Sequence, residues 1–125
     1  MPRTTFTSPD APKPGGPYSG AVRSGQLVWT AGQCGYRQDK SLVDGLEGQV
    51  RQAFANLLLA LESAGAGEQD VTAVNVFLAD GDDFEAMNAI YVEHFSEPYP
   101  VRTTVTVGLR PGVLFEINAQ AVIPA

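Results

Sequence analysis

Residues 44–65 read DGLEGQVRQAFANLLLALESAG and predict the clearest helix of the chain. Apolar side chains recur at helical spacing along one face, at Leu46, Val50, Phe54, Leu57, Leu58 and Leu61. Asp44 and Glu47 have the spacing of a capping box, and Gly65 suits the position after the last turn. Four polar residues fall mainly off the apolar stripe, as expected of a solvated face: Arg51, Gln52, Asn56 and Glu62.

The segments around this helix alternate in polarity as strands do. Residues 71–78 predict a strand in which Val74, Val76 and Leu78 share one face, whereas Asn75 and Phe77 share the other. Three further strands are predicted, over residues 27–31, 103–107 and 114–122. Residues 25–26 are expected to form a turn before the first of these, residues 32–35 to break it, and residues 110–112 to form the turn between the last two.

A second helix is predicted between residues 82 and 97. Asp82 and Glu85 repeat the capping-box spacing, and Pro98 marks the end of the helix. Its inner face is expected to carry Phe84, Met87, Tyr91 and Phe95. Two helices can cover only one face of a sheet of this size. Because the other face carries Trp29 and Phe77, we expect a second subunit to cover it, and hence a homo-oligomer.

Composition limits the classes of function. The chain has 125 residues, of which 44% are apolar and 18% charged, the balance of one globular domain. The single cysteine, Cys34, excludes a disulfide scaffold, and no apolar run approaches the roughly 18 residues of a membrane span. We therefore expect a cytoplasmic protein with no membrane partner.

The basic residues argue against a nucleic-acid partner. Eight Lys and Arg against fourteen Asp and Glu give a net charge of −6. No two basic residues are adjacent, whereas affinity for a phosphate backbone depends on clustered cations. A small anionic ligand remains compatible with the sequence, because one arginine can hold a carboxylate whatever the net charge.

Arg102 and Glu116 are the charged residues that tell most about the last two strands. Alternation places Arg102 on the same strand face as Thr104, and Glu116 on the same face as Asn118. If the two strands pair as a hairpin, Arg102 and Glu116 lie at the same end of the sheet. Spacing alone favours a cross-strand ion pair, which contributes only about 0.2–1 kcal/mol when exposed, over an active site.

The sequence contains no recognisable nucleophile or metal motif. Nothing brings Cys34 near the only histidine, His94, so we favour buried packing for the thiol and a solvated helix end for the imidazole. No cluster of metal ligands is visible, and the glycines and serines form neither a phosphate-binding loop nor a nucleophile elbow. We expect no metal and no cofactor.

Short motifs in a fixed order extend over nearly the whole chain. They are residues 16–19 (GPYS), 30–33 (TAGQ), Gln49, Asn56 and Leu57 in the first helix, residues 76–80 (VFLAD), Asp83-Phe84 with Asn88 and Tyr91, residues 100–105 (PVRTTV) and residues 116–119 (EINA). Together they resemble the RidA (YjgF-type) reactive-intermediate deaminases, formerly also called L-PSP endoribonucleases.

The resemblance implies a fold and an assembly. The fold is a single α+β domain of chorismate-mutase-like type, spanning residues 1–125, with two helices on one face of a mixed sheet. Three copies form a homotrimer in which the helices lie outside and the sheets face inward. Three ligand clefts then lie between adjacent subunits. This assembly agrees with the uncovered sheet face inferred above.

The resemblance also implies a reaction. Members that act as deaminases hydrolyse 2-imino acids, or enamine tautomers such as 2-aminoacrylate, to a 2-keto acid and ammonia. The arginine matching Arg102 binds the substrate carboxylate, and the glutamate matching Glu116 orients or activates the attacking water. Tyr18 and Asn88 match other positions in the cleft or supporting it, and the backbone near Gly32 is expected to line it.

Two expected cleft positions depart from the family pattern. Thr104 stands where a cysteine is common, and Ala31 stands where the serine of a Ser-Gly-Gln motif is common; both changes are expected to alter substrate range or rate. The first hypothesis is therefore a deaminase of small 2-imino acids, and the alternative is a non-catalytic ligand-binding or chaperone-like trimer. The net charge of −6 disfavours the old ribonuclease label.

Overall fold

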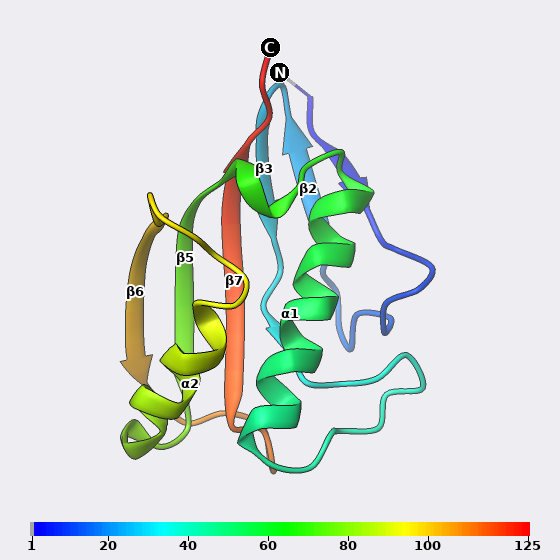
Figure 1. Ribbon diagram of the computed structural model, residues 1–125. Coiled ribbons are helices and arrows are strands. Elements are labelled where there is room, and N and C mark those ends of the chain that lie inside the picture. The colour runs from blue at the N-terminus through cyan, green and yellow to red at the C-terminus, as the bar shows by residue number, and fades with distance from the viewer. Residues whose placement is uncertain (1) are drawn as a thin grey trace.

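Helix α1 (Leu46–Ser63) lies along one face of the sheet in the computed structural model, which describes residues 2–125 (Figure 1). Val50, Phe54 and Leu57 are buried, as the apolar stripe predicts. Gly65 ends the helix at φ 88°, and the Ala66 amide donates to the Leu61 carbonyl, which is the pairing of a Schellman cap. The predicted capping box is wrong, because the N-cap is residue 45, a glycine, and no side chain bonds there.

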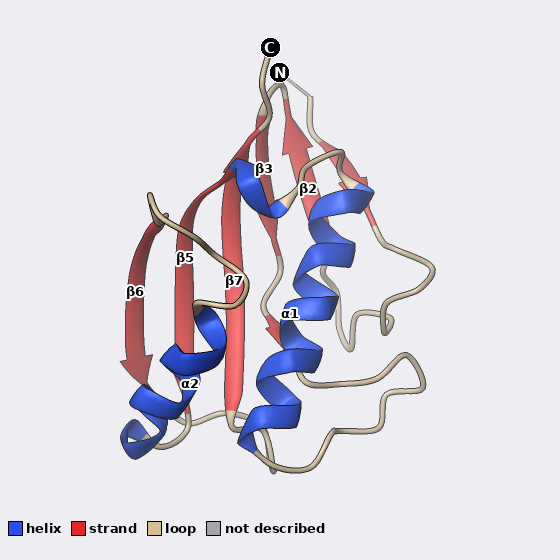
Figure 2. Ribbon diagram, viewed as in Figure 1, coloured by secondary structure: helices blue, strands red, loops and turns tan. Residues whose placement is uncertain are grey.

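The sheet is mixed and has the strand order β1-β2-β3-β7-β5-β6, with β4 also pairing with β7. Its strands are β1 (Thr4–Phe6), β2 (Ala21–Ser24), β3 (Leu27–Thr30), β4 (Gln33–Cys34), β5 (Val71–Leu78), β6 (Val101–Thr106) and β7 (Phe115–Val122). The β5–β6 pair is parallel and the other pairs are antiparallel. The predicted α+β class, with two helices on one face of a mixed sheet, is confirmed (Figure 2).

The last two strands do not form a hairpin, so the condition under which Arg102 and Glu116 would lie at the same end of the sheet is not met. Strand β5 lies between them, with Arg102 of β6 beside Val74 and Glu116 of β7 beside Phe77. Helix α2 connects β5 to β6, which makes the two strands parallel neighbours. The connection from β6 to β7 spans residues 107–114, which is long enough to pass over the end of one strand.

Helix α2 (Phe84–Tyr91) is shorter than predicted, because the chain turns directly after Tyr91. It follows a 3-10 turn, Gly81–Asp83, which the Asp80 carboxylate caps by accepting from the Asp82 amide at 2.9 Å. The predicted capping box at residues 82 and 85 is therefore wrong. Phe84 was expected on the inner face but is 42% exposed. No helix within residues 2–125 is both long and apolar enough to span a membrane.

The two faces of the sheet differ in cover. Val74, Val76 and Leu78 are buried against the helices, as the alternation predicts. The opposite face of the sheet carries apolar side chains that this chain leaves exposed. They are Leu27, Trp29, Val101, Val105 and Val122.

His94 is not the solvated helix end that the sequence indicated. Its ring stacks on Phe54, with centroids 4.1 Å apart and planes 3° apart. Its Nδ1 lies 3.8 Å from Oε1 of Glu68, and only about a quarter of either side chain is exposed. His94 therefore packs on the outer part of the core.

Two buried amides on α1 hold loops of the chain in place. Asn56, expected on the solvated face, is 2% exposed and donates to the Cys34 and Tyr36 carbonyls at 3.0 and 2.8 Å. Gln49 donates to the Gly112 carbonyl at 3.0 Å and accepts from the Leu114 amide at 2.8 Å. These bonds satisfy backbone groups that the sheet leaves unpaired.

Replacing Asn56 with alanine should lower the free energy of unfolding by about 2–4 kcal/mol, because two carbonyls lose their donor in a buried setting. Arg51→Ala, on the exposed side of the same helix, is the matched control. It removes an exposed pair with Glu93 and should cost less than about 1 kcal/mol. Urea unfolding at one fixed protein concentration measures both values, and equal losses would contradict the role of Asn56.

Candidate functional site

The predicted site residues fall into two groups on opposite faces of the sheet. Arg102 shares its face with Val74, toward the helices, whereas Glu116 shares its face with Phe77. Val74 and Phe77, the β5 residues beside Arg102 and Glu116, are three residues apart, which is roughly 10 Å along the strand. One copy of the chain therefore cannot bring both side chains to one small molecule, and the cross-strand ion pair that spacing favoured does not form.

The Glu116 half-site consists of Tyr18, Ala31, Gly32, Cys34 and Glu116. All five line a cavity of about 910 Å³. The chain leaves β3 at Thr30 and resumes pairing with β7 at Gln33, so residues 31 and 32 lie outside the strands and line the cavity. The Ala31 amide donates to the Gly20 carbonyl at 2.9 Å, which holds this segment in place. Three predicted site residues besides Glu116 thus lie with it: Tyr18, Ala31 and Gly32.

The Glu116 carboxylate lies directly against the backbone of Gly32. A Cβ placed on Gly32 would overlap with Oε2 of Glu116 and lie 2.9 Å from its Cδ. Any side chain at residue 32 would displace the carboxylate from this position. The GQ motif after β3 therefore has a steric reason, which the sequence alone does not reveal.

The thiol of Cys34 also contacts this carboxylate. Its Sγ lies 3.4 Å from Oε1 of Glu116, to which it donates a hydrogen bond. Burial, and then the negative charge of Glu116, raise the pKa of the Cys34 thiol from 9.0 to about 12. Cys34 is half-buried, so the prediction of buried packing holds only in part, and the contact with Glu116 was not foreseen.

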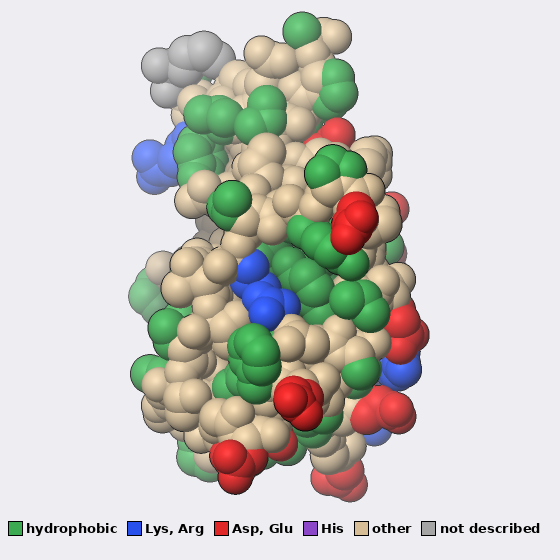
Figure 3. All heavy atoms as spheres, turned by 60° about the vertical axis from the view of Figure 1, so that its left-hand side comes forward, with side chains coloured by type: hydrophobic (Ala, Val, Ile, Leu, Met, Phe, Trp, Pro, Cys, Tyr) green, Lys and Arg blue, Asp and Glu red, His purple; other side chains and the backbone are tan. Residues whose placement is uncertain are grey.

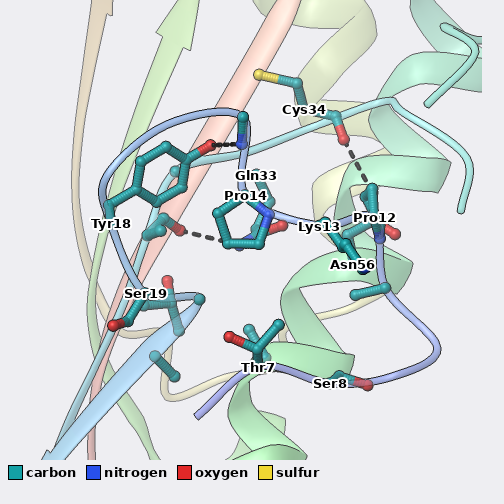
Figure 4. A pocket seen from close by; sticks show the side chains of 18 of the residues that line it. Thr7, Ser8, Pro12, Lys13, Pro14, Tyr18, Ser19, Gln33, Cys34 and Asn56 are labelled. Atoms are coloured by element: carbon teal, nitrogen blue, oxygen red, sulfur yellow. Dashed lines mark hydrogen bonds between the residues drawn. The ribbon is translucent and has the colours of Figure 1, made fainter. Parts of the chain in front are cut away.

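Tyr18 belongs to the loop that crosses the cavity (Figure 4). Its hydroxyl accepts a hydrogen bond from the Gly15 amide at 3.1 Å, which ties the side chain to the proline-rich segment. The side chain is 54% exposed. An exposed aromatic ring that is held in one position is well placed to contact a ligand or a neighbouring subunit.

The Arg102 half-site consists of Asn88, Tyr91, Tyr99 and Arg102. These residues line a second hollow, of about 400 Å³, between α2 and the start of β6. The guanidinium carbon of Arg102 lies 4.6 Å from the Tyr91 ring centroid and 5.6 Å from that of Phe84. Figure 3 shows basic atoms among hydrophobic side chains on this side of the molecule. Within residues 2–125, no carboxylate lies within ion-pair distance of Arg102.

Two hydroxyl groups near Arg102 are buried without a partner. Oγ1 of Thr104 and Oη of Tyr91 make no hydrogen bond to residues 2–125. Thr104 shares the face of Arg102 but does not line the hollow itself. Burial raises the pKa of Tyr91, and Arg102 acts in the opposite direction. Unpaired buried hydroxyls are costly and mark a place where a ligand or water can bond.

Sequence reasoning missed several residues of the two half-sites. Tyr91 was assigned to the core, and Tyr99 received no role. Arg110, which lines the cavity of the Glu116 half-site, was assigned only to a turn. Cys34 could have been linked to Glu116 only by knowing that β4 pairs with β7. The only feature of the sequence that pointed to Arg110 was its place in the turn just before the strand that carries Glu116. The described residues contain no group of three or more His, Cys, Asp or Glu side chains that could hold a metal ion.

The fold and the two half-sites define a small α+β domain with hollows of ligand size on its surface. The model of the family described as Endoribonuclease L-PSP matches residues 8–123. The chain therefore belongs to this family, which is the RidA family that the motifs resemble.

Relatives and solved structures agree with this membership. The chain is 38% identical over 125 residues to a 2-iminobutanoate/2-iminopropanoate deaminase of Dermatophagoides farinae, covering 98% of each chain. RidA from the Antarctic bacterium Psychrobacter sp. PAMC 21119 has a TM-score of 0.92 at 37% identity, with 96% of this chain and 99% of that chain covered. E. coli TdcF with bound serine has a TM-score of 0.90 at 30% identity, with 97% and 99% covered.

The Cys34 thiol should react slowly with iodoacetamide at pH 8. With a pKa of about 12 it holds almost no thiolate, so alkylation should be at least about 100-fold slower than in the urea-unfolded chain. Glu116→Gln removes the neighbouring negative charge and should speed the reaction. Mass spectrometry of timed samples measures both rates. Equal rates in the folded and unfolded wild-type chain would show that the thiol is not held against Glu116.

Proposed function

We propose that this protein hydrolyses small 2-imino acids to 2-keto acids and ammonia, in clefts between the subunits of a homotrimer. The observation that carries the proposal is the state of Arg102, which is half-buried against aromatic rings with no carboxylate partner within residues 2–125. A cation in such a place has lost part of its hydration without an ion pair in return. A substrate carboxylate would supply that pair.

The two half-sites support an assembly in which neighbouring subunits complete each other. Arg102 and Glu116 lie on opposite faces of one sheet, so a shared substrate needs one residue from each of two copies. The exposed apolar face, which includes Trp29 and Val101, is the surface that such an assembly would bury. A protein with bound serine among the structural relatives supports a small ligand of this kind.

Arg102 would hold the substrate carboxylate and set its orientation. A guanidinium offers two parallel donors that match a carboxylate, each bond to a charged group contributing about 1.5–3 kcal/mol. Asn88 lines the same hollow and provides a further polar group. The buried hydroxyl of Thr104, which has no partner within residues 2–125, is a third group available nearby.

Glu116 of the neighbouring subunit would manage the protons. A protonated imine carbon is electrophilic enough for attack by water, and Glu116 accepts a proton from that water as the C–O bond forms. The resulting carbinolamine carries hydroxyl and amino groups on one carbon. Glu116 returns the proton to nitrogen, the C–N bond breaks to release ammonia, and the hydroxyl proton passes to that ammonia as the ketone forms. The sum is iminium plus water to 2-keto acid plus ammonium.

A non-catalytic ligand-binding trimer is the second candidate. The observation that favours it is the small number of polar groups that the Glu116 half-site leaves free for a ligand. Ala31 offers no hydroxyl there, and one oxygen of Glu116 already accepts a bond from Cys34. Binding of 2-keto acids without ammonia release from imines would separate it from the deaminase.

The cytoplasmic location remains an expectation from the sequence.

Imine hydrolysis tests the reaction directly. An amino-acid oxidase generates 2-imino acids in the assay, and semicarbazide traps whatever the protein leaves. Wild type should deplete the trapped imine, and Arg102→Ala should lose most of this activity, on the order of 100-fold, because the carboxylate loses its anchor. Arg51→Ala is the control for loss of an arginine elsewhere. No depletion by wild type across small, branched and aromatic imines would favour the ligand-binding candidate.

Mixing two inactive variants tests whether a cleft needs two copies. Arg102→Ala and Glu116→Ala should each be inactive, yet randomly mixed trimers should recover about a quarter of wild-type activity. About three-quarters of such trimers contain both variants, and each of these has one intact cleft of three. Light scattering confirms the trimer before the assay. A mass near one chain, or no recovery from mixtures with verified subunit exchange, would contradict the inter-subunit cleft.

A further inference from the structure

The cavity beside Glu116 gathers basic side chains. Lys13, Lys40 and Arg110 line it, three of the eight Lys and Arg residues in a chain of net charge −6. Of the described residues that line the cavity, Glu116 is the only acidic one. A cavity whose charges are mainly of one sign concentrates its potential and attracts ligands of the opposite sign. The local charge is therefore opposite to that of the whole chain.

The exposed side chain of Arg110 lies at the rim of this cavity. Its Nη1 lies 3.5 Å from the position that a Cβ on Gly15 would take, and the Gly15 amide donates to the Tyr18 hydroxyl. The Arg110 carbonyl accepts from the Val113 amide at 3.0 Å, which closes the turn. The buried Gln49 holds the next part of that turn by donating to the Gly112 carbonyl.

No ion pair within residues 2–125 occupies these cations. Lys13, Lys40 and Arg110 have no carboxylate within 4 Å, whereas the exposed Arg51 pairs with two glutamates. Figure 4 places Lys13 among the residues around the cavity, with Tyr18 and Cys34. Arg110 also lowers the pKa of Cys34, against the larger effects of burial and Glu116, which agrees with a position near the Glu116 half-site.

We infer that the substrate carries a second carboxylate, distal to the imine, and that Arg110 binds it. This inference rests on the proposed function, in which Arg102 of the neighbouring subunit binds the first carboxylate. The proposed function assigns no role to the basic residues that line the cavity of Glu116, which are Lys13, Lys40 and Arg110. The negative charge of Glu116 would repel a doubly charged substrate unless nearby cations offset it, and Arg110 with Lys13 and Lys40 supplies that charge. The favoured substrates are 2-imino dicarboxylates.

Binding of two 2-keto acids tests this without relying on turnover. By calorimetry, 2-oxoglutarate should bind wild type at least about tenfold more tightly than 2-oxobutanoate, because only the former reaches Arg110 with a carboxylate. Arg110→Gln should remove most of this difference. Arg3→Gln changes the net charge equally, and Arg3 does not line the cavity, so it should keep the difference. In the imine assay, Arg110→Gln should lower kcat/KM for 2-iminoglutarate relative to 2-iminobutanoate by about tenfold.

The outcomes separate this inference from the proposed function. Equal affinities for the two keto acids in wild type, or an unchanged difference in Arg110→Gln, would overturn the role of Arg110 even if 2-iminobutanoate is hydrolysed. Tighter binding of 3-phosphonopyruvate than of 2-oxoglutarate would replace the distal carboxylate by a phosphoryl group and overturn the dicarboxylate assignment. Arg110-dependent binding of 2-oxoglutarate without hydrolysis of any imine would support the inference while the proposed deaminase function fails.

Discussion

The pairing of β5 with β6 on one side and β7 on the other determines where Arg102, Thr104 and Glu116 lie. Arg102 lies beside Val74 and Glu116 beside Phe77, and because these two β5 residues are an odd number apart, Arg102 and Glu116 face opposite sides of the sheet. The helices then cover the side of Arg102 and shape its hollow, whereas Glu116 faces the cavity under the N-terminal loop.

Burial and charge act together in each half-site. Around Arg102, aromatic rings remove water from a cation while leaving it without a counter-ion within residues 2–125. Around Glu116, the close approach of Gly32 and the protonated thiol of Cys34 hold a carboxylate in one place. Each half-site thus holds a charged side chain in a defined setting, and the proposed inter-subunit cleft would bring the two half-sites together.

Much of the fold follows from periodicity, which reports the buried face of each element. The bounds and alternation of β5 were predicted correctly, and so was the glycine that ends α1. Pairing partners were not, because alternation in β6 and β7 is the same whether or not another strand lies between them. The capping boxes failed because their spacing occurs by chance in acidic segments. Asn56 was misplaced because a polar side chain on a helix is normally solvated, and only its loop contacts reveal why it is buried. The resemblance suggested candidate site residues, whereas the close approach of Gly32 to Glu116 became apparent only in the structure.

The two buried amides of α1 fix the spacing between two parts of the site. Gln49 and Asn56 are seven residues apart, two turns or about 10 Å along the axis, and so share one flank of the helix. One holds the turn that carries Arg110, and the other holds the strand that carries Cys34. Adding or removing a single residue between them would rotate one amide by about 100° relative to the other. We therefore expect this helical segment to tolerate substitutions of its exposed side chains better than the insertion or deletion of one residue.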